Sequence, residues 1–581
     1  MKHYLLSGAA MAFAVSGSWQ LSASAQEEAT PNRAVDEEAR LSTVTVSARK
    51  IEETLEEAPV AVTAIDEEAL EQLTIQSGID LVRQIPSATF ISAGPEYLSD
   101  ISIRGQGAGR LGFTESATGI YRNGVYVAGG GFGGRSFNRL DLFDVSTIET
   151  YRGPQSGLYG RNAVGGAVNV LSNKPEFEPG GRLKAGYEDT ERVTLEAVGN
   201  LPLNDVFAVR VGGFYVDQED GFYTDVNTGE TLDTVEYYGA RGSIRARFGA
   251  STEANLSVEY LDNDAPSFAT LGERLPVDNG GVPIAGVSDP GRFERNASNP
   301  GGRVEIEEIS VLGDFSNDFG PITFDLLFNY KDRDGSRAGD DLDHFLGFQG
   351  VGGTDLTVMQ NEAFERYTVE ARLSSTAGER FSWLIGADTQ GFESVVFLEN
   401  EGSSFVPPLA SLATRTENTD EELESYSIFG TAEYQLTDVI SVSVEGRVVN
   451  DVKTFSFVRN EMGVNLIDTG QLEVDETRFL PSATLGFDLA EHGNVYLRYA
   501  TGYRPFGFNT GVPDESFIPY DEEVVRSYEI GWKNTLADDL LDYRLAAFFM
   551  DTDDPQLSTA ISSEDTTTAL QNVSGSEIYG L

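Results

Sequence analysis

"YYGARGSIRARF" occupies residues 237–248 and alternates between two kinds of side chain. In a β-strand successive side chains point to opposite faces of the sheet, so this alternation predicts a strand with one apolar and one polar face. The apolar face carries Tyr238, Ala240, Ile244, Ala246 and Phe248, and the polar face carries Tyr237, Arg241, Ser243, Arg245 and Arg247. "ITFDLLFNYK" (322–331) and "ISVSVEGRV" (440–448) repeat the pattern. From about residue 180 onward the chain is therefore predicted to be almost entirely β-structure.

The connections between these strands alternate in length. We expect short turns near 202–205, 249–253, 316–321, 375–380, 436–439, 490–493 and 537–540, and long loops at 263–304, 332–366, 391–424, 450–477 and 503–524. Short turns at one end of the sheet and long loops at the other are typical of outer-membrane barrels. A soluble β-sandwich or propeller would show similar alternation, but inward faces rich in Arg, Glu, Asp and Asn suit a water-filled lumen. The predicted fold class is mainly β, a transmembrane antiparallel β-barrel.

The amino terminus has the pattern of an export signal. Lys2 supplies the positive region, residues 5–19 supply a short apolar region, and Ala23-Ser24-Ala25 forms a small-residue cleavage site. We therefore predict a signal peptide over residues 1–25. Beyond it we find no apolar run of about eighteen residues, so the sequence does not predict an α-helical membrane protein.

Composition excludes several classes of function. The chain has no cysteine and only three histidines, His3, His344 and His492, so neither disulfides nor a histidine metal site is expected. The formal net charge of -52 opposes nucleic-acid binding, which depends on neutralising phosphates. No acid, base and nucleophile set converges, so we expect no enzyme, no catalytic residues and no resident cofactor or metal.

Residues 56–174 read as a compact α+β unit. Asp66 is a candidate cap for a helix over 67–73, and Ser77 with Asp80 forms a capping box for a helix that Pro86 ends. Asn123-Gly124 predicts a turn between two short strands. Strands are also expected at 148–152 and 166–171, with a tight turn at 153–157 between them. The glycine-rich stretches 106–112 and 129–134 lack the pattern of a nucleotide-binding loop.

Several blocks resemble the TonB-dependent outer-membrane receptor family, iron-complex receptor type. The plug blocks are "PVAVTAIDEEALEQL" (59–73), "ISIRGQG" (101–107), "GIYRNGVYV" (119–127) and "IETYRGPQSGLYGRNAVGGAVNVLSNKP" (148–175). The barrel blocks are "YSIFGTAEYQLTD" (426–438), "YLRYATGYRPFGFN" (496–509), "SYEIGWKN" (527–534) and "NVSGSEIYG" (572–580). The resemblance implies a 22-stranded barrel with an amino-terminal α+β plug in its lumen. We count about fifteen strands and the start of a sixteenth, and therefore expect the chain to lack its final strands.

The resemblance divides the chain into four parts: a signal peptide (1–25), a flexible amino terminus with a TonB box (26–50), a plug (51–175) and an incomplete barrel (180–581). "STVTVSA" (42–48) resembles the TonB box. The residues assigned to that box are Leu41, Ser42, Thr43, Val44, Thr45, Val46, Ser47 and Ala48. The resemblance also implies that Arg104 and Arg152 of the plug pair with barrel glutamates, for which Glu529 and Glu445 are candidates. Ligand-contacting plug loops are expected to present Gly107, Gly109, Arg110, Phe113, Gly131, Phe132, Arg135 and Phe137.

The implied function is active uptake of a scarce ligand across the outer membrane of a Gram-negative bacterium. A ferric siderophore or related iron chelate is the favoured cargo, with iron present only as part of that cargo. The same machinery could import vitamin B12, an oligosaccharide or another organic nutrient, and a passive porin or surface adhesin is the alternative from another class. The implied partners are TonB with ExbB and ExbD, outer-membrane lipid and the siderophore-like ligand, and we expect a monomer.

Overall fold

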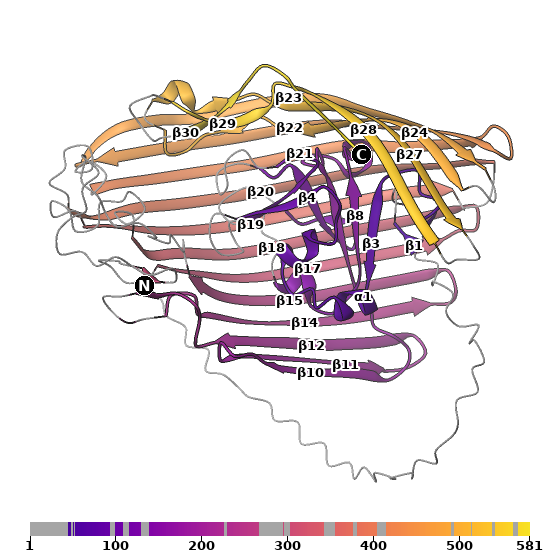
Figure 1. The fold of residues 1–581 in the computed structure, drawn as a ribbon, viewed down its shortest axis with the longest axis horizontal. Helices are drawn as coiled ribbons and strands as arrows, with labels where there is room; N and C mark the ends of the chain where they lie inside the picture. The colour runs from indigo at the N-terminus through magenta and orange to yellow at the C-terminus, as the bar shows by residue number, and fades with distance from the viewer. Residues whose placement is uncertain are drawn as a thin grey trace, which may run out of the picture. The chain divides into compact units, whose positions relative to one another are not determined.

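Sixteen antiparallel strands form the large sheet of the described part of the chain (Figure 1). Each strand pairs with its neighbours in chain order. The strands are β10 (Gly180–Tyr187), β11 (Arg192–Pro202), β12 (Phe207–Gln218), β14 (Val235–Phe248), β15 (Thr252–Pro266), β17 (Arg303–Asp318), β18 (Ile322–Asp341), β19 (Asp355–Ser375), β20 (Phe381–Ser403), β21 (Arg415–Gln435), β22 (Ile440–Glu461), β23 (Val464–Asp488), β24 (Asn494–Arg504), β27 (Glu523–Leu536), β28 (Leu541–Asp553) and β31 (Ser576–Gly580). The prediction of a mainly β, antiparallel fold is confirmed.

The computed structural model describes residues 45–47, 50, 53–92, 99–107, 115–128, 139–225, 229, 231–266, 294–295, 302–341, 355–375, 380–403, 414–489, 493–512, 514–536, 541–561 and 568–581. All of them belong to one compact unit that spans Thr43–Leu581. The predicted signal peptide and five residues assigned to the TonB box, Leu41, Ser42, Thr43, Val44 and Ala48, lie outside the described residues.

The two faces of the strands differ as the sequence predicts. On β14, Arg241 and Ser243 are 3% and 8% exposed, whereas Tyr238 and Ile244 are 40% and 39% exposed. The polar face therefore points inward and the apolar face outward, the reverse of a soluble protein and the arrangement of a barrel in lipid.

Long loops were predicted in several places where the structure instead has extended strands. β22 and β23 run through most of residues 450–477 and are joined only by Met462 and Gly463, both at positive φ. Likewise β18 continues to Asp341 and β20 to Ser403. These predictions of loops were wrong. The end of β18 is polar on both faces, which removes the alternation that marks a strand, but the end of β22 does alternate, with Phe455 and Phe457 on its buried face.

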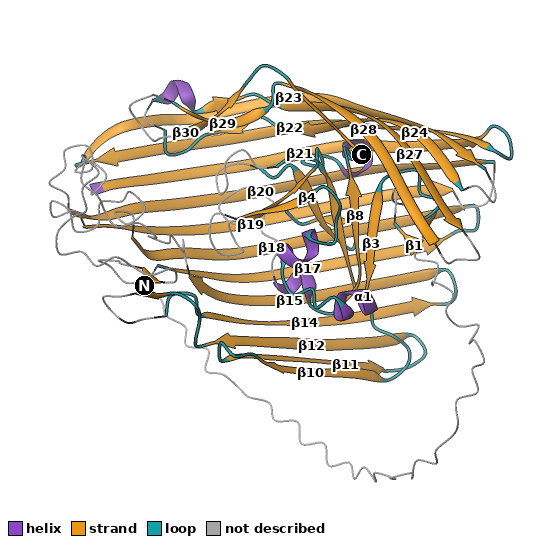
Figure 2. Cartoon of the chain, in the orientation of Figure 1, coloured by secondary structure: helices purple, strands orange, loops and turns teal. Residues whose placement is uncertain are grey.

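The amino-terminal domain contains a five-stranded sheet with the order β3-β8-β9-β6-β7. Figure 2 shows that helix is confined to short segments of the chain. The domain's elements are β2 (Glu53–Thr54), β3 (Val62–Asp66), α1 (Glu67–Gln72), α2 (Gly78–Val82), β4 (Ala88–Ser92), β5 (Ser99–Ile103), β6 (Thr118–Arg122), β7 (Val125–Tyr126), η3 (Arg139–Leu142), β8 (Val145–Arg152), α3 (Ser156–Tyr159) and β9 (Gly166–Ser172).

The capping and turn residues identified in the sequence lie at the starts of these helices and in the predicted hairpin turn. The Asp66 carboxylate accepts the Ala69 N–H at 2.9 Å and begins α1, and the Ser77 hydroxyl accepts the Asp80 N–H at 3.3 Å and begins α2. Asn123 and its following glycine both have positive φ, as the hairpin turn between β6 and β7 requires. These predictions are confirmed.

The tight turn predicted at 153–157 is wrong. Residues 153–165 instead leave the β8–β9 pair and include α3, all four residues of which are buried. This segment begins at Gly153, whose φ of +83° is a backbone conformation that residues with a side chain rarely adopt. A Cβ at this position would also lie 2.5 Å from a nitrogen of Arg104. Residues 153–165 pack against the inner face of the large sheet.

Pairs of short strands lie within the connections between strands of the large sheet. They comprise β13 (Thr224–Asp225) with β16 (Glu294–Arg295), β25 (Gly507–Phe508) with β26 (Pro519–Tyr520), and β29 (Gln556–Ala560) with β30 (Thr568–Asn572). Phe508 of β25 stacks on Phe455 of β22 with ring centroids 4.7 Å apart, so this connection folds inward over the sheet.

Candidate functional site at the interface between the amino-terminal domain and the sheet

Three residues of the predicted TonB box are described, and they dock on the amino-terminal domain. Thr45 and Val46 form β1 (Thr45–Val46), which pairs with β2, and Val46 is 1% exposed. The Ser47 N–H donates to the Glu149 carboxylate at 2.7 Å, and the Tyr159 hydroxyl donates to the Ser47 carbonyl at 3.3 Å. Burial raises the pKa of Glu149, while its hydrogen bonds favour the charged form. One short strand and a few hydrogen bonds therefore hold this segment.

Lys50 ties the same segment to the large sheet. Its ammonium lies 2.6 Å from the Glu370 carboxylate of β19, with the two side chains 3% and 9% exposed, and 4.6 Å from the centre of the Phe429 ring. Burial lowers the pKa of Lys50 to about 7, and the neighbouring Arg372 and Arg447 contribute in the same direction against the attraction of Glu370. Glu370 also pairs with Arg372, so it keeps a cationic partner when Lys50 loses its proton.

We expect docking of this segment to strengthen as the pH rises from about 7 toward 10.5. In that window a released lysine, with its usual pKa of 10.5, keeps its proton, whereas the docked lysine has lost it. Docking is therefore weakest below pH 7. A spin label on Thr45→Cys, in a chain with no native cysteine, measures the immobile fraction. Lys50→Met is the control and should abolish the dependence; a pH-independent wild-type signal would contradict the assignment.

The structure brings together two of the four residues predicted to form ion pairs between the domains. Arg104 lies 2.6 Å from Glu529 of β27, and its guanidinium stacks 4.0 Å from the centre of the Phe548 ring. Both charged side chains are almost completely buried. Arg104 also has positive φ, so the bend in the backbone helps to aim its side chain.

Arg152 and Glu445 do not pair with each other. Burial lowers the pKa of Arg152, Arg104 adds to this effect and Glu529 opposes it, so Arg152 shares the environment of the Arg104–Glu529 pair. Both terminal nitrogens of Arg498 hold the Glu445 carboxylate, at 3.0 and 3.1 Å. The expectation that Glu445 binds a plug arginine is corrected: it lies against α3, but Arg498 of β24, the next strand but one, supplies its cation.

Sequence reasoning missed a buried charge cluster around Glu115. Its carboxylate accepts hydrogen bonds from Arg161 at 2.6 Å, from Lys453 of β22 at 2.8 Å and from Asn162. Arg161 and Lys453 hold the pKa of Glu115 down at about 2 against the opposing effect of burial. The Tyr503 N–H and carbonyl of β24 also bond to residues beside this cluster, Ser156 and Asn162. Arg161 and Asn162 lie within the plug block 148–175, but nothing in the sequence points to Glu115 or Lys453 as their partners.

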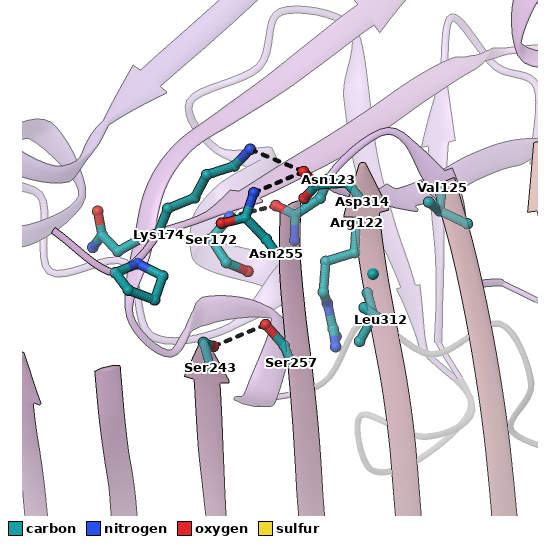
Figure 3. A pocket seen from close by; sticks show the side chains of 13 residues that line it. Arg122, Asn123, Val125, Ser172, Lys174, Ser243, Asn255, Ser257, Leu312 and Asp314 are labelled. Atoms are coloured by element: carbon teal, nitrogen blue, oxygen red, sulfur yellow. Dashed lines mark hydrogen bonds and ion pairs between the residues drawn. The ribbon is translucent and has the colours of Figure 1, made fainter. Parts of the chain in front are cut away.

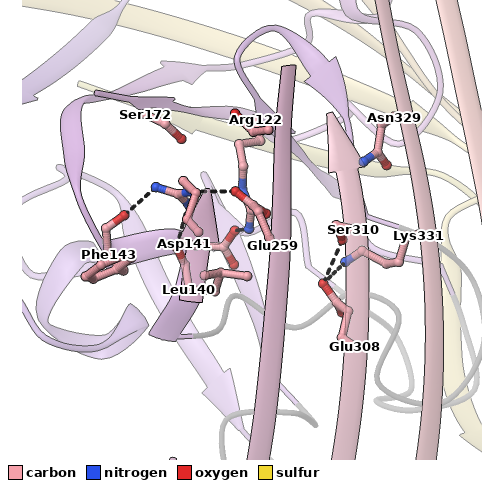
Figure 4. Close-up of polar contacts among 12 residues, drawn as sticks. Arg122, Leu140, Asp141, Phe143, Ser172, Glu259, Glu308, Ser310, Asn329 and Lys331 are labelled. Carbon is pink, nitrogen blue, oxygen red and sulfur yellow. Dashed lines mark hydrogen bonds and ion pairs between the residues drawn. The ribbon is translucent and has the colours of Figure 1, made fainter. Parts of the chain in front are cut away.

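A second cluster joins the amino-terminal domain to the other side of the sheet (Figure 4). Arg122 contacts both Asp141 and Glu259, and Arg241 donates to Glu259 at 2.6 Å. Arg241 also donates to the Phe143 carbonyl at 2.7 Å. Two arginines and two carboxylates thus balance one another across the interface.

Most of the predicted ligand-contacting residues lie outside the described residues: Gly109, Arg110, Phe113, Gly131, Phe132, Arg135 and Phe137. The remaining one, Gly107, is described, and its carbonyl accepts a hydrogen bond from Arg504 at 3.1 Å. Within the described ranges no group of three or more acidic or histidine side chains is arranged to hold a metal ion.

Two family models match the chain. The TonB-dependent Receptor Plug Domain matches residues 54–167, and the TonB dependent receptor-like, beta-barrel model matches residues 269–581, more than half of the chain. The chain belongs to the TonB-dependent receptor family. The resemblance noted in the sequence is therefore confirmed, and the members of this family are receptors and transporters, not enzymes.

Individual relatives of the receptor are distant. The pesticin receptor of Yersinia enterocolitica is 24% identical over 510 residues, covering 86% of this chain and 68% of its own. The vitamin B12 transporter BtuB of Vibrio vulnificus is 25% identical over 225 residues, covering 38% of this chain and 35% of its own. The ferric yersiniabactin uptake receptor FyuA from Yersinia pestis superposes with a TM-score of 0.72 at 18% identity, covering 89% of this chain and 74% of its own.

The family assigns the two parts of the interface to a plug and a barrel wall. Among the described residues, no helix is long and apolar enough to cross a membrane. The plug touches the barrel through charged and polar side chains on several strands, including Glu370, Glu529, Lys453 and Glu259.

Proposed function

We propose that the receptor imports a ferric siderophore or a related iron chelate through the outer membrane, driven by TonB. The observation that carries this proposal is the docked strand β1, which lies within the segment assigned to the TonB box and is tied to the plug and to the barrel. Pulling on a strand so placed would first break its pairing with β2 and then the Lys50–Glu370 ion pair. A strand with one free edge can also add to a sheet of another protein.

Several parts of the proposal come from sequence and family. A signal peptide over residues 1–25 would export the chain to the outer membrane of a Gram-negative bacterium. Residues 26–50 would carry the TonB box, 51–175 the plug and 180–581 the barrel. ExbB and ExbD would energise TonB, and the receptor would act as a monomer without a resident cofactor, iron entering only within the cargo.

The cargo is proposed from the relatives. The structural neighbour is named for ferric yersiniabactin uptake and one sequence relative for vitamin B12 transport, so the same machinery could serve either class. The longer sequence match is to a pesticin receptor. A passive porin or an adhesin is the alternative from another class, and the plug contacts on several sides of the lumen argue against a porin.

Uptake measurements separate these candidates. Cells that express the full-length receptor as their only route for the test ligand are given ferric yersiniabactin labelled with ⁵⁵Fe, or labelled vitamin B12. We expect TonB-dependent accumulation of the iron complex and none of the vitamin. Accumulation of vitamin B12 alone would show that the vitamin, not the iron complex, is the cargo. Flux that persists in cells without TonB would indicate a porin.

A further inference from the structure

The inner and outer faces of the large sheet carry different kinds of cavity. A cavity between the plug and strands β14, β15 and β17 has a volume of about 20 Å³, and its lining includes Ser243 and Ser257, whose hydroxyls bond at 2.8 Å (Figure 3). This volume holds about one water molecule. The outer face instead carries an apolar groove of about 610 Å³. Its volume lies within the range of small-ligand sites, about 300–1,000 Å³.

The groove lies between two rows of outward-facing side chains. The members of each row stand directly opposite one another on neighbouring strands. The first row is Ala483, Tyr499, Tyr528 and Phe549, and the second is Val442, Leu485, Leu497, Ile530 and Ala547. Leu497, Tyr528 and Ile530 are 44%, 52% and 50% exposed, so the rows lie on the face that a barrel turns toward lipid. The other lining residues, Thr484, Arg498, Glu529 and Phe548, alternate with them along the strands and point inward.

Strand pairing and side-chain size together make this face hollow. β23 has 25 residues but pairs with β24 only from Ser482 to Asp488. Beyond this narrow junction β27 and β28 run at an angle to β20 and β21 (Figure 1), and a sheet twisted in this way is hollow along one diagonal of its outer face. The rings of Tyr499, Tyr528 and Phe549, with centroids 5.3 and 6.4 Å apart in that order, form one continuous side of the groove.

A charged row borders the aromatic side of the groove. Arg526 stands opposite Thr501 and Asp551, on the side of the connection 505–522, and its guanidinium lies 2.6 Å from the carboxylate of Asp553. Charged side chains on the outer face of a barrel mark the edge of its apolar band. Because barrel strands tilt by about 35–45°, a groove that crosses them runs obliquely from this edge into the apolar band.

The dimensions of the groove suit a single acyl chain. Two residues along each strand separate the rows, which gives a width of about 7 Å, and the second row crosses five strands, which gives a length of about 19 Å. An α-helix with its side chains is about 10–12 Å across and therefore too wide. The hydrocarbon of one leaflet is about 15 Å thick, half of the bilayer core, and this is the reach of one lipid chain.

We propose that the groove binds one acyl chain of a membrane lipid, held between its aromatic and aliphatic rows. Lipids that packed over the groove without entering it would leave a void, whereas a chain inside it makes dispersion contacts along both rows. A chain in this position also braces the short junction between β23 and β24. This inference rests on the proposed outer-membrane placement, and the test below separates the two.

Two tryptophans allow contact with lipid to be measured inside and outside the groove region. Trp532 stands opposite Val495 and Leu545, in the row next to the second row of the groove. Trp383, two residues before the exposed Ile385, faces outward from β20 away from the groove. Phosphatidylcholine with a dibrominated acyl chain, which quenches an indole that it touches, is titrated into the full-length receptor in maltoside micelles. The signal of each tryptophan is the difference from Trp532→Phe or Trp383→Phe.

We expect the quenching of Trp532 to saturate near one lipid per receptor and that of Trp383 to rise in proportion to the lipid. Ala483→Phe and Ala547→Phe fill the groove and should abolish the saturable quenching. Ala387→Phe is the matched control, because Ala387 stands opposite the exposed Ile428 on the same outer face but away from the groove. Native mass spectrometry should show one retained lipid on the wild type and on Ala387→Phe, and none on the two filled variants.

Proportional quenching of both tryptophans, or saturation that persists in both filled variants, would overturn the proposal. A lipid-free dimer that both filled variants abolish would overturn it too, because a second copy would then cover the groove. Vesicles made entirely of the brominated lipid test the placement separately, since both tryptophans should be quenched strongly there. Absence of quenching in these vesicles would refute the placement of the barrel in lipid, whereas strong quenching there with a proportional titration in micelles would refute the groove alone.

Discussion

Glu115→Gln is expected to loosen the plug from strand β22 and to destabilise it by about 3–5 kcal/mol, the usual effect of removing one partner from a buried ion pair. The carboxylate lies between Arg161 and Lys453, whose side chains are 2% and 1% exposed. Glutamine removes the carboxylate that the two buried cations share and leaves Arg161 with Asp451 at 3.9 Å and Lys453 with Glu421 at 3.0 Å. Hydrogen exchange of the β6 and β9 amides measures the loss, and exchange there should become markedly faster.

Acid should reproduce the effect in the wild-type receptor. The pKa of Glu115 lies at about 2 in the folded plug and at 4.5 when free, so the cluster stabilises the plug fully above pH 4.5. This contribution is lost as the pH falls from about 4.5 to about 2. In Glu115→Gln this part of the acid sensitivity should disappear, and Glu365→Gln, at an exposed position on β19, should change neither property. Unaltered exchange in Glu115→Gln would contradict a stabilising role.

Glu529→Gln is expected to weaken the other end of the interface to a similar degree, about 3–5 kcal/mol. The Glu529 carboxylate lies 2.6 Å from Arg104, and its charge also favours the protonated form of the nearby Arg152. Without it, two buried arginines repel each other, so the plug should seal the lumen less well. Swelling of liposomes that contain the variant should be faster with small sugars than with the wild type.

Second-site changes distinguish charge balance from general damage. Glu529→Gln combined with Arg152→Gln removes one charge of each sign and should recover part of the seal. Glu393→Gln, at an exposed position on β20, is the matched control and should swell like the wild type. If the double variant leaks more than Glu529→Gln alone, repulsion between the arginines is not the cause.

Features set by neighbouring residues, such as strand faces, helix starts and turns, could be predicted from the sequence. Period-two alternation gave the inward and outward faces of β14, and Asp66 and Ser77 marked the starts of two helices. Each of these signals acts over a few residues, because strand alternation and helix capping are set by neighbours in the chain. The same holds for the turn at Asn123.

Contacts between the plug and the barrel could not be read in the same way. Glu115 meets Lys453 across 338 positions, and Lys50 meets Glu370 across 320. Partners so distant are chosen by the register of the whole barrel, which a single sequence does not specify. Glu445 illustrates the difficulty: the resemblance made it a candidate partner of a plug arginine, but Arg498, two strands along the sheet, reaches it instead.

The hairpin that β22 and β23 form has a consequence for work on living cells. These strands are 22 and 25 residues long, whereas about ten tilted residues suffice to cross lipid. Its tip, Met462-Gly463, therefore stands well clear of the bilayer, and Met462 is 71% exposed. In the proposed outer-membrane placement, a short peptide tag spliced between these two residues would be displayed to antibodies on intact bacteria, so that individual receptor molecules could be counted and tracked without a change in the lumen.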